Sequence, residues 1–206
     1  RDRVLADGPV QQIADLKGRK IGFSVAGVEE ALLSAILDRH GVDFADIELV
    51  NVNWSLSPSL MSKQVDAVIG AFRNFELNQM DIENRPGRAF FVEEFGIPAY
   101  DELILVANQN KLSNPALRSF IDGLEAGVQY LVNHPDESWK LFISGDRKDL
   151  DDELNRRAWR DTLPRFALRP GALDRTRYLR FARFLKEQEI IKKIAPLDDW
   201  AVELEN

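Results

Sequence analysis

The chain has 206 residues, of which 45% are hydrophobic and 30% are charged, so it has enough apolar material for a buried core and too much for a disordered tail. No run of about twenty apolar residues is present, and the net charge of -7 argues against nucleic acid as the main partner. With no cysteine and two histidines, the chain lacks the usual ligands of zinc and iron–sulfur sites, so we expect no metal and no redox cofactor.

The first half of the chain alternates short apolar runs with helical patterns, which is typical of a parallel sheet covered by helices. The expected strands lie at residues 20–24, 48–52, 66–70, 89–92 and 103–107. The expected helices lie at residues 28–40, 56–63 and 75–83, and the first of them stops at His40 and Gly41. The sequence therefore predicts a β-α-β-α-β unit within residues 20–70.

The second half of the chain is predicted to be helical. Helices are expected at residues 115–133, 136–142, 151–163 and 174–187, separated by turns rich in Pro, Gly or Asp. They carry large side chains that need a surface to pack against, namely Phe120, Leu124, Tyr130, Leu131, Trp139, Phe142, Trp159, Phe166, Phe181 and Phe184. We expect the upstream sheet to be too small to cover all of these side chains.

No catalytic motif is present, because the sequence contains no G-x-S-x-G elbow, no P-loop and no G-x-G-x-x-G. His40 and His134 are both expected at helix ends, where capping is favoured over general acid–base catalysis. We therefore predict that the chain has no catalytic residue and that it binds a ligand.

Three turns should open at one edge of the predicted sheet, because the carboxyl ends of parallel strands meet there. These turns are residues 24–27, 53–55 and 71–76. Gly27 would free backbone amides for a polar or anionic group, but Glu29 and Glu30 in the next helical turn would repel a phosphate. The predicted ligand is therefore neutral or cationic, or carries its acceptor only at the helix tip.

Side chains of the second and third turns suit a flat, amino-substituted heterocycle. The indole of Trp54 could stack on such a ring, or it could plug the layer between sheet and helix. Asn74 and Glu76 supply an amide and a carboxylate beside Phe72 and Phe75, although a merely solvated glutamate is the alternative.

Several segments resemble one known family. Residues 14–22 (ADLKGRKIG) are similar to the signature that opens the second lobe of many type II solute-binding proteins of ABC importers. The NMT1/THI5-like group, which binds pyrimidine precursors of thiamine, is resembled more specifically by residues 27–33 (GVEEALL), 65–76 (VDAVIGAFRNFE) and 98–103 (PAYDEL). The likeness extends through residues 133–137 (NHPDE) and 154–159 (LNRRAW), so it covers nearly the whole chain.

The resemblance implies an α/β fold of the type II periplasmic-binding-protein kind, with two lobes that close around a hydroxymethylpyrimidine or formylaminopyrimidine. It assigns residues 14–98 to a complete α/β lobe two, and residues 1–13 and 99–206 to the strand and helices of an incomplete lobe one. The N-terminal segment of the family is expected to be absent. By the same analogy the ligand-binding residues are Ser24, Gly27, Val28, Asn53, Trp54, Asn74, Glu76 and Tyr100. Asn74 and Glu76 would contact the pyrimidine edge, Trp54 would stack on the ring, and residues 24–28 would cap the ligand.

The implied partners are the pyrimidine ligand and the membrane subunits of an ABC importer, with no nucleic acid. We also expect a dimer formed through the truncated lobe. The implied location is periplasmic, or extracellular and membrane-associated, with an export signal outside this chain. The related fungal synthases, which build the pyrimidine, are one competing interpretation, but they carry a cysteine-rich motif that this chain lacks. A sensory domain and a binding protein for a sulfonate or aromatic acid also stay open, and the acidic pair Glu29 and Glu30 weighs against a sulfonate.

Overall fold

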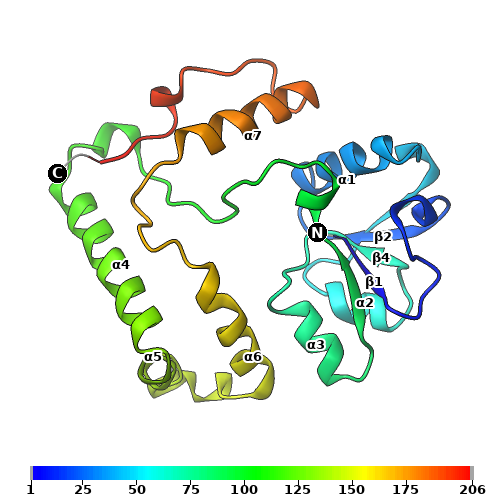
Figure 1. The fold of residues 1–206 in the computed structure, drawn as a ribbon, viewed down its shortest axis with the longest axis horizontal. Helices are drawn as coiled ribbons and strands as arrows, with labels where there is room; N and C mark the ends of the chain where they lie inside the picture. The colour runs from blue at the N-terminus through cyan, green and yellow to red at the C-terminus, as the bar shows by residue number, and fades with distance from the viewer. Residues whose placement is uncertain (1, 205–206) are drawn as a thin grey trace. The chain divides into compact units, whose positions relative to one another are not determined.

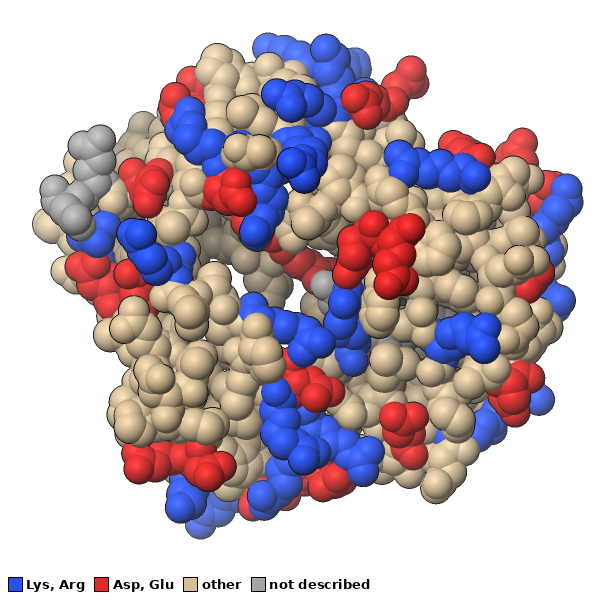
Figure 2. All heavy atoms as spheres, viewed as in Figure 1, with Lys and Arg blue, Asp and Glu red and all other residues tan. Residues whose placement is uncertain are grey.

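The computed structural model describes residues 2–204, with side chains from Val4 onward. The chain forms two compact units, Arg1–Pro98 and Ala99–Asn206. The first unit contains a sheet with covering helices, and the second contains helices joined by irregular segments. On the face drawn in Figure 2, basic side chains are interspersed with acidic ones.

The first unit is organised around one five-stranded sheet with the strand order β3-β2-β4-β1-β5. Its strands are β1 (Asp2–Leu5), β2 (Lys20–Phe23), β3 (Glu48–Asn51), β4 (Ala67–Val68) and β5 (Gly87–Phe90). Its helices are α1 (Val28–Arg39), α2 (Leu56–Met61) and α3 (Glu76–Ile82), with short 3₁₀ helices at Ile13–Leu16, Phe44–Asp46 and Val92–Phe95. Because β2 pairs in parallel with both β3 and β4, the predicted β-α-β-α-β unit is confirmed.

Helices cover both faces of this sheet, with α1 on one face and α2 and α3 on the other (Figure 1). Side chains alternate between the two faces along a strand, so a sheet covered on both sides has two apolar layers. The cluster beneath α2 and α3 consists of Leu5, Val52, Leu56, Leu60, Val65, Val68, Ala71 and Met80. On α1, Leu33 and Ile36 are at most 1% exposed. This double cover holds the strand ends, and the turns that follow them, in fixed positions.

Strand β1 was not predicted, and its position corrects the assignment of residues 1–13 to the other lobe. β1 pairs antiparallel with β4 and with β5, so this segment lies inside the first unit. The sheet is therefore mixed rather than purely parallel. A strand of four residues is too short to show a period in the sequence, and its partners lie more than sixty residues away in the chain.

The second unit contains α4 (Pro115–Asn133), α5 (Pro135–Phe142), α6 (Glu153–Thr162) and α7 (Arg175–Glu187). Short 3₁₀ helices lie at Gln109–Lys111, Gly145–Leu150, Leu163–Arg165 and Leu197–Asp199. Side chains of Asn114, Asp152 and Asp174 accept hydrogen bonds from the backbone N–H groups of the first helical turns, which fixes the starts of α4, α6 and α7. Within residues 2–204, no helix combines the length and the apolarity needed to cross a membrane.

Most of the aromatic side chains of the second unit pack against one another, so they find a packing surface within their own unit. The rings of Trp139, Phe142 and Trp159 lie 5.2–5.8 Å apart between centroids. Phe184 is only 3% exposed, whereas Phe120 stays 57% exposed. Helices therefore close on themselves to a greater extent than their pattern indicated, because aromatic side chains of α5 and α6 can cover each other.

The strand expected at residues 103–107 is not formed. Residues 96–108, between β5 and α4, form neither helix nor strand (Figure 1), and no strand is described in the second unit with which they could pair. Four consecutive apolar side chains are consequently exposed: Leu103 by 86%, Ile104 by 57%, Leu105 by 55% and Val106 by 86%. A strand needs a neighbour for its backbone hydrogen bonds, so the apolar pattern alone does not make one. We call residues 103–106 the apolar segment.

Candidate functional site

Three turns lie at the carboxyl ends of the parallel strands β2, β3 and β4, and side chains connect them. The Ser24 hydroxyl, after β2, donates to the backbone carbonyl of Asn53, after β3. Glu29, at the start of α1, contacts Gly70 in the segment that follows β4. The structure therefore brings the three turns together at one edge of the sheet, as the strand order predicts.

The first turn is held by two glutamates of α1. Oε2 of Glu29 accepts hydrogen bonds from the backbone N–H groups of Ser24, at 3.0 Å, and Val25, at 3.1 Å. Oε2 of Glu30 accepts from the N–H of Gly27, which has a φ of +91° and begins the helix, at 3.3 Å. The amides that Gly27 was expected to leave open are thus bonded to carboxylates of the chain itself. Val28, next in the chain, is 48% exposed.

Glycine is required at position 70 by the close approach of Glu29. Gly70 has a φ of +89°, and a Cβ placed on it would lie 2.2 Å from Oε1 of Glu29. Since Oε2 of the same carboxylate is held by two amides, the side chain has little freedom to withdraw. The first and third turns therefore share one packed contact.

We expect the substitution Gly70→Ala to destabilise the protein by about 1 kcal/mol more than Gly41→Ala does, because only the former displaces Glu29 from its amides. Gly41 has a φ of +70°, and no neighbouring atom lies within 4 Å of the position that a Cβ would take there. Gly41→Ala therefore costs only the strain of placing an alanine at a positive φ. Urea unfolding of both variants measures the difference. Equal midpoints would show that Glu29 moves aside without cost.

The second turn exposes an aromatic ring. Asn53 has a φ of +52°, and its N–H donates to Oδ1 of Asn51 at 2.8 Å, which forms a tight local turn. Trp54 follows and is 78% exposed. This exposure rules out the alternative that Trp54 plugs the layer between sheet and helix. A flat, solvent-facing indole next to this turn is free to stack on a ring.

Asn74 and Glu76 lie in and just after the third turn, and both are half-buried. Oε2 of Glu76 accepts a hydrogen bond from the N–H of Phe72 at 2.6 Å, while the backbone carbonyl of Asn74 accepts from the side-chain amide of Asn78 at 3.0 Å. Glu76 is thus a positioned carboxylate and not a merely solvated one. Phe75 beside it is 37% exposed.

Arg73 is a feature of the third turn that was not singled out in the sequence. Its guanidinium lies 4.0 Å from the centroid of the Phe91 ring and pairs with the Glu93 carboxylate. Its Nε is buried and, within the described part of the chain, has no hydrogen-bond partner. A single arginine in the otherwise uncharged run AVIGAFRNF was the signal that could have identified it.

Tyr100 belongs to the second unit, so the structure does not group it with the other seven expected ligand residues. Its ring stacks on Phe181 with 4.5 Å between centroids. Both rings line an apolar cavity of about 470 Å³, together with Tyr178 and Trp200. Burial raises the pKa of the Tyr178 hydroxyl above its ordinary value.

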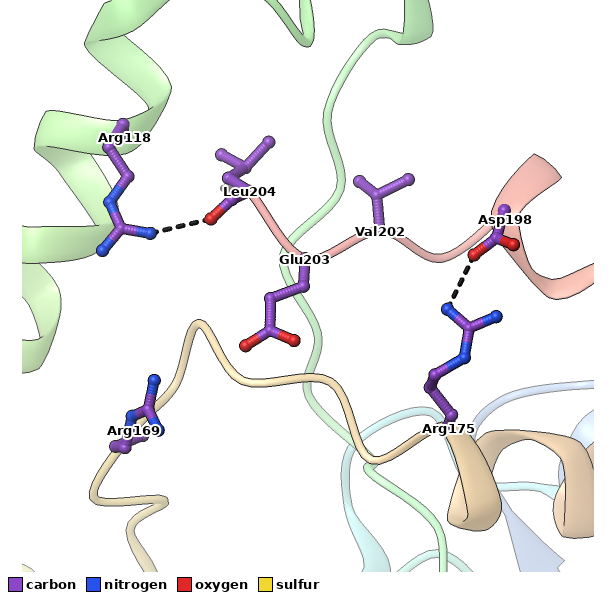
Figure 3. A pocket seen from close by; sticks show the side chains of 7 residues that line it. All are labelled: Arg118, Arg169, Arg175, Asp198, Val202, Glu203 and Leu204. Carbon is purple, nitrogen blue, oxygen red and sulfur yellow. Dashed lines mark hydrogen bonds and ion pairs between the residues drawn. The ribbon is translucent and has the colours of Figure 1, made fainter. Parts of the chain in front are cut away.

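A second cavity of the same unit, about 460 Å³ in volume, is lined by charged side chains (Figure 3). Arg175 donates to Oδ1 of Asp198 at 2.7 Å, and this hydrogen bond lowers the pKa of Asp198. Arg118 donates to the backbone carbonyl of Leu204 at 2.8 Å and also pairs with Asp122. Two of the three arginines that line this cavity, Arg118 and Arg175, are thus bonded to neighbouring groups of the chain.

His40 ends α1 and His134 lies between α4 and α5, which confirms the expected helix-end positions of both histidines. Among residues 2–204, no group of three or more His, Cys, Asp and Glu side chains is arranged to hold a metal ion. The groups that the strand-end turns of the first unit present to a ligand are the Glu76 carboxylate, which accepts hydrogen bonds, and the exposed Trp54 ring, which can stack.

Comparison with known proteins gives consistent matches. The family model described as NMT1/THI5 like matches residues 3–138. A Haemophilus influenzae protein named as a thiamine biosynthesis protein is 50% identical over 202 residues, which are 98% of this chain and 64% of that protein. The formylaminopyrimidine-binding protein of Halalkalibacterium halodurans is 29% identical over 142 residues, which are 68% of this chain and 43% of that protein.

A solved structure shares the fold. The alkanesulfonate-binding protein SsuA of Xanthomonas axonopodis pv. citri, bound to MOPS, matches with a TM-score of 0.63 at 16% identity over 93% of this chain and 65% of that one. The chain therefore has the α/β fold of type II periplasmic binding proteins. It spans less than two thirds of the length of each of these three proteins.

Proposed function

The chain belongs to the NMT1/THI5-like family, and from that membership we propose that the protein is the solute-binding component of an ABC importer and binds a hydroxymethylpyrimidine or formylaminopyrimidine. In this proposal residues 14–98, joined by β1, form lobe two, and residues 99–206 belong to lobe one. The relative named as a formylaminopyrimidine-binding protein supports this ligand class. Periplasmic or extracellular location and contact with importer membrane subunits are parts of the same proposal.

The observation that carries the ligand class is the positioned carboxylate of Glu76, at the same edge of the sheet as the exposed indole of Trp54. An aminopyrimidine offers N–H donors on its edge and a flat face, so a carboxylate and a ring can both be used. Glu76 is half-buried and is anchored through Oε2 by the N–H of Phe72, which holds it in place for a ligand. Trp54, with 78% of its surface exposed, supplies the stacking surface.

An enzymatic role and a sulfonate ligand are less well supported. The pyrimidine synthases that resemble this family use a cysteine-rich motif, and this chain has no cysteine. A sulfonate needs donors, yet the N–H groups of Ser24 and Val25 are bonded to Glu29. The chain shares its fold with a sulfonate-binding protein, but a shared fold does not imply a shared ligand.

We expect hydroxymethylpyrimidine to bind the 206-residue chain at least about tenfold more tightly than an alkanesulfonate does. The carboxylate of Glu76 and the indole of Trp54 suit an aminopyrimidine, whereas the N–H groups of Ser24 and Val25 are already bonded to Glu29. A ¹⁵N-¹H NMR titration measures both ligands. Saturable shifts should be confined to amides of residues 24–28, 53–55 and 71–76. Equal responses to the two ligands, or shifts elsewhere only, would contradict the proposed function.

A further inference from the structure

Glu29 acts as an anion supplied by the chain itself. Its Oε2 accepts from two successive backbone N–H groups, Ser24 at 3.0 Å and Val25 at 3.1 Å. Successive amides that converge on one oxygen form the kind of concavity that binds phosphate or sulfonate oxygens in other proteins. In this chain a glutamate oxygen occupies that position, next to the start of α1, where the helix dipole also favours negative charge.

The position of Glu29 is fixed from the other side by Gly70. A Cβ on residue 70 would lie only 2.2 Å from Oε1 of Glu29, so the glycine leaves the room that the carboxylate needs. The carboxylate is therefore clamped between the turns after β2 and β4. It is half-buried, and its side chain cannot leave the amides without breaking two charge-assisted hydrogen bonds.

Glu29 and Glu30 form no ion pair within residues 2–204. The cation of the third turn, Arg73, is paired with Glu93. An anionic ligand would have to displace Glu29 from its amides and approach two carboxylates. A ligand that is uncharged or cationic and carries N–H donors meets neither obstacle.

We propose that Glu29 is a specificity-determining residue, which occupies the amides of Ser24 and Val25 and thereby excludes anionic ligands from the strand-end site. The inference rests on the proposed function for the identity of the accepted ligand, and it adds the class of ligand that is refused. A side chain that occupies the donors needed by one ligand class excludes that class. One fold can therefore distinguish anionic from uncharged ligands without a change in the backbone.

The test compares Glu29→Ala with Glu30→Ala in the 206-residue chain, using sodium sulfate as the probe and sodium chloride of equal ionic strength as the reference. Glu30→Ala is the matched control, because it removes the same charge one residue later and leaves the Ser24 and Val25 amides bonded. In Glu29→Ala, these two amides should show a saturable sulfate-specific shift with an apparent affinity at least about tenfold above that of the unchanged chain and of Glu30→Ala.

Equal sulfate affinities in the two alanine variants, or no sulfate response of Ser24 and Val25 in Glu29→Ala, overturn the proposal. If Glu29→Ala does not fold, Glu29→Leu and Glu30→Leu are compared instead. Leucine fills a similar volume and has no acceptor for the two amides, so the sulfate response of Glu29→Leu should exceed that of Glu30→Leu, and equal responses again overturn the proposal. The sulfate measurement requires no pyrimidine, so a failed pyrimidine titration counts against the proposed function and not against the role of Glu29.

Discussion

Replacing Leu103 and Val106 together with lysine is expected to weaken self-association of this chain by about a hundredfold or more. Each residue is 86% exposed, and both belong to the apolar segment, which pairs with no strand described within residues 2–204. Burying a Leu or Val side chain is worth about 1.5–3 kcal/mol, so two of them account for a change of this size. Four consecutive exposed apolar side chains favour pairing with the same segment of a second copy.

Sedimentation velocity across a dilution series measures this effect. The matched control is the double variant Leu141→Lys and Leu168→Lys, which adds the same charge at two side chains exposed by 60% and 57% outside the apolar segment. The control should associate like the unchanged chain. A chain that stays monomeric at high concentration, or two double variants that behave alike, would show that the apolar segment does not mediate dimerisation.

The substitution Glu76→Gln is expected to weaken pyrimidine binding by about 1–3 kcal/mol, or roughly 5- to 150-fold, because an acceptor-only carboxylate is replaced by an amide that presents donors to the ligand amino group. The fold should be retained, because the glutamine oxygen can still accept the hydrogen bond that Phe72 donates to Glu76. Calorimetric titration with hydroxymethylpyrimidine gives the change in affinity.

Glu83→Gln is the control for this substitution. Glu83 lies at the other end of α3, is exposed, and carries the same charge. Its replacement should leave the affinity unchanged. The comparison distinguishes a direct contact of Glu76 with the ligand from the long-range effect of the net negative charge. If both variants bind like the unchanged chain, Glu76 does not contact the ligand. If both lose affinity equally, the effect is one of net charge.

Helix positions could be predicted from the sequence because their signals are local. Asn114 followed by Pro115 begins α4, and His134 followed by Pro135 separates α4 from α5. Each of these signals acts within one helical turn of the residue that carries it. The parallel strands were also found, since a sheet covered on both faces needs continuous apolar runs such as the one at residues 67–69.

Strand pairing was harder to predict, because it depends on partners elsewhere in the chain. β1 is short and has no visible period, yet it forms a strand between β4 and β5. The apolar segment has the composition of a strand, yet it forms none, because no described strand of its unit lies beside it. Composition therefore predicted a strand at the apolar segment, where none forms, and gave no sign of the strand that β1 forms.

Local sequence patterns are enough to show a globular α/β chain without cysteine, three turns that follow parallel strands, and acidic side chains at the start of α1. What those acidic side chains do depends on contacts between distant parts of the chain. The register that pairs Gly22 with Val68 brings Gly70 next to the turn after β2, and Glu29 then fills the space between them. Residues 29 and 70 are distant in sequence, and a side chain can bond two amides and pack on a glycine only after the sheet has set their separation.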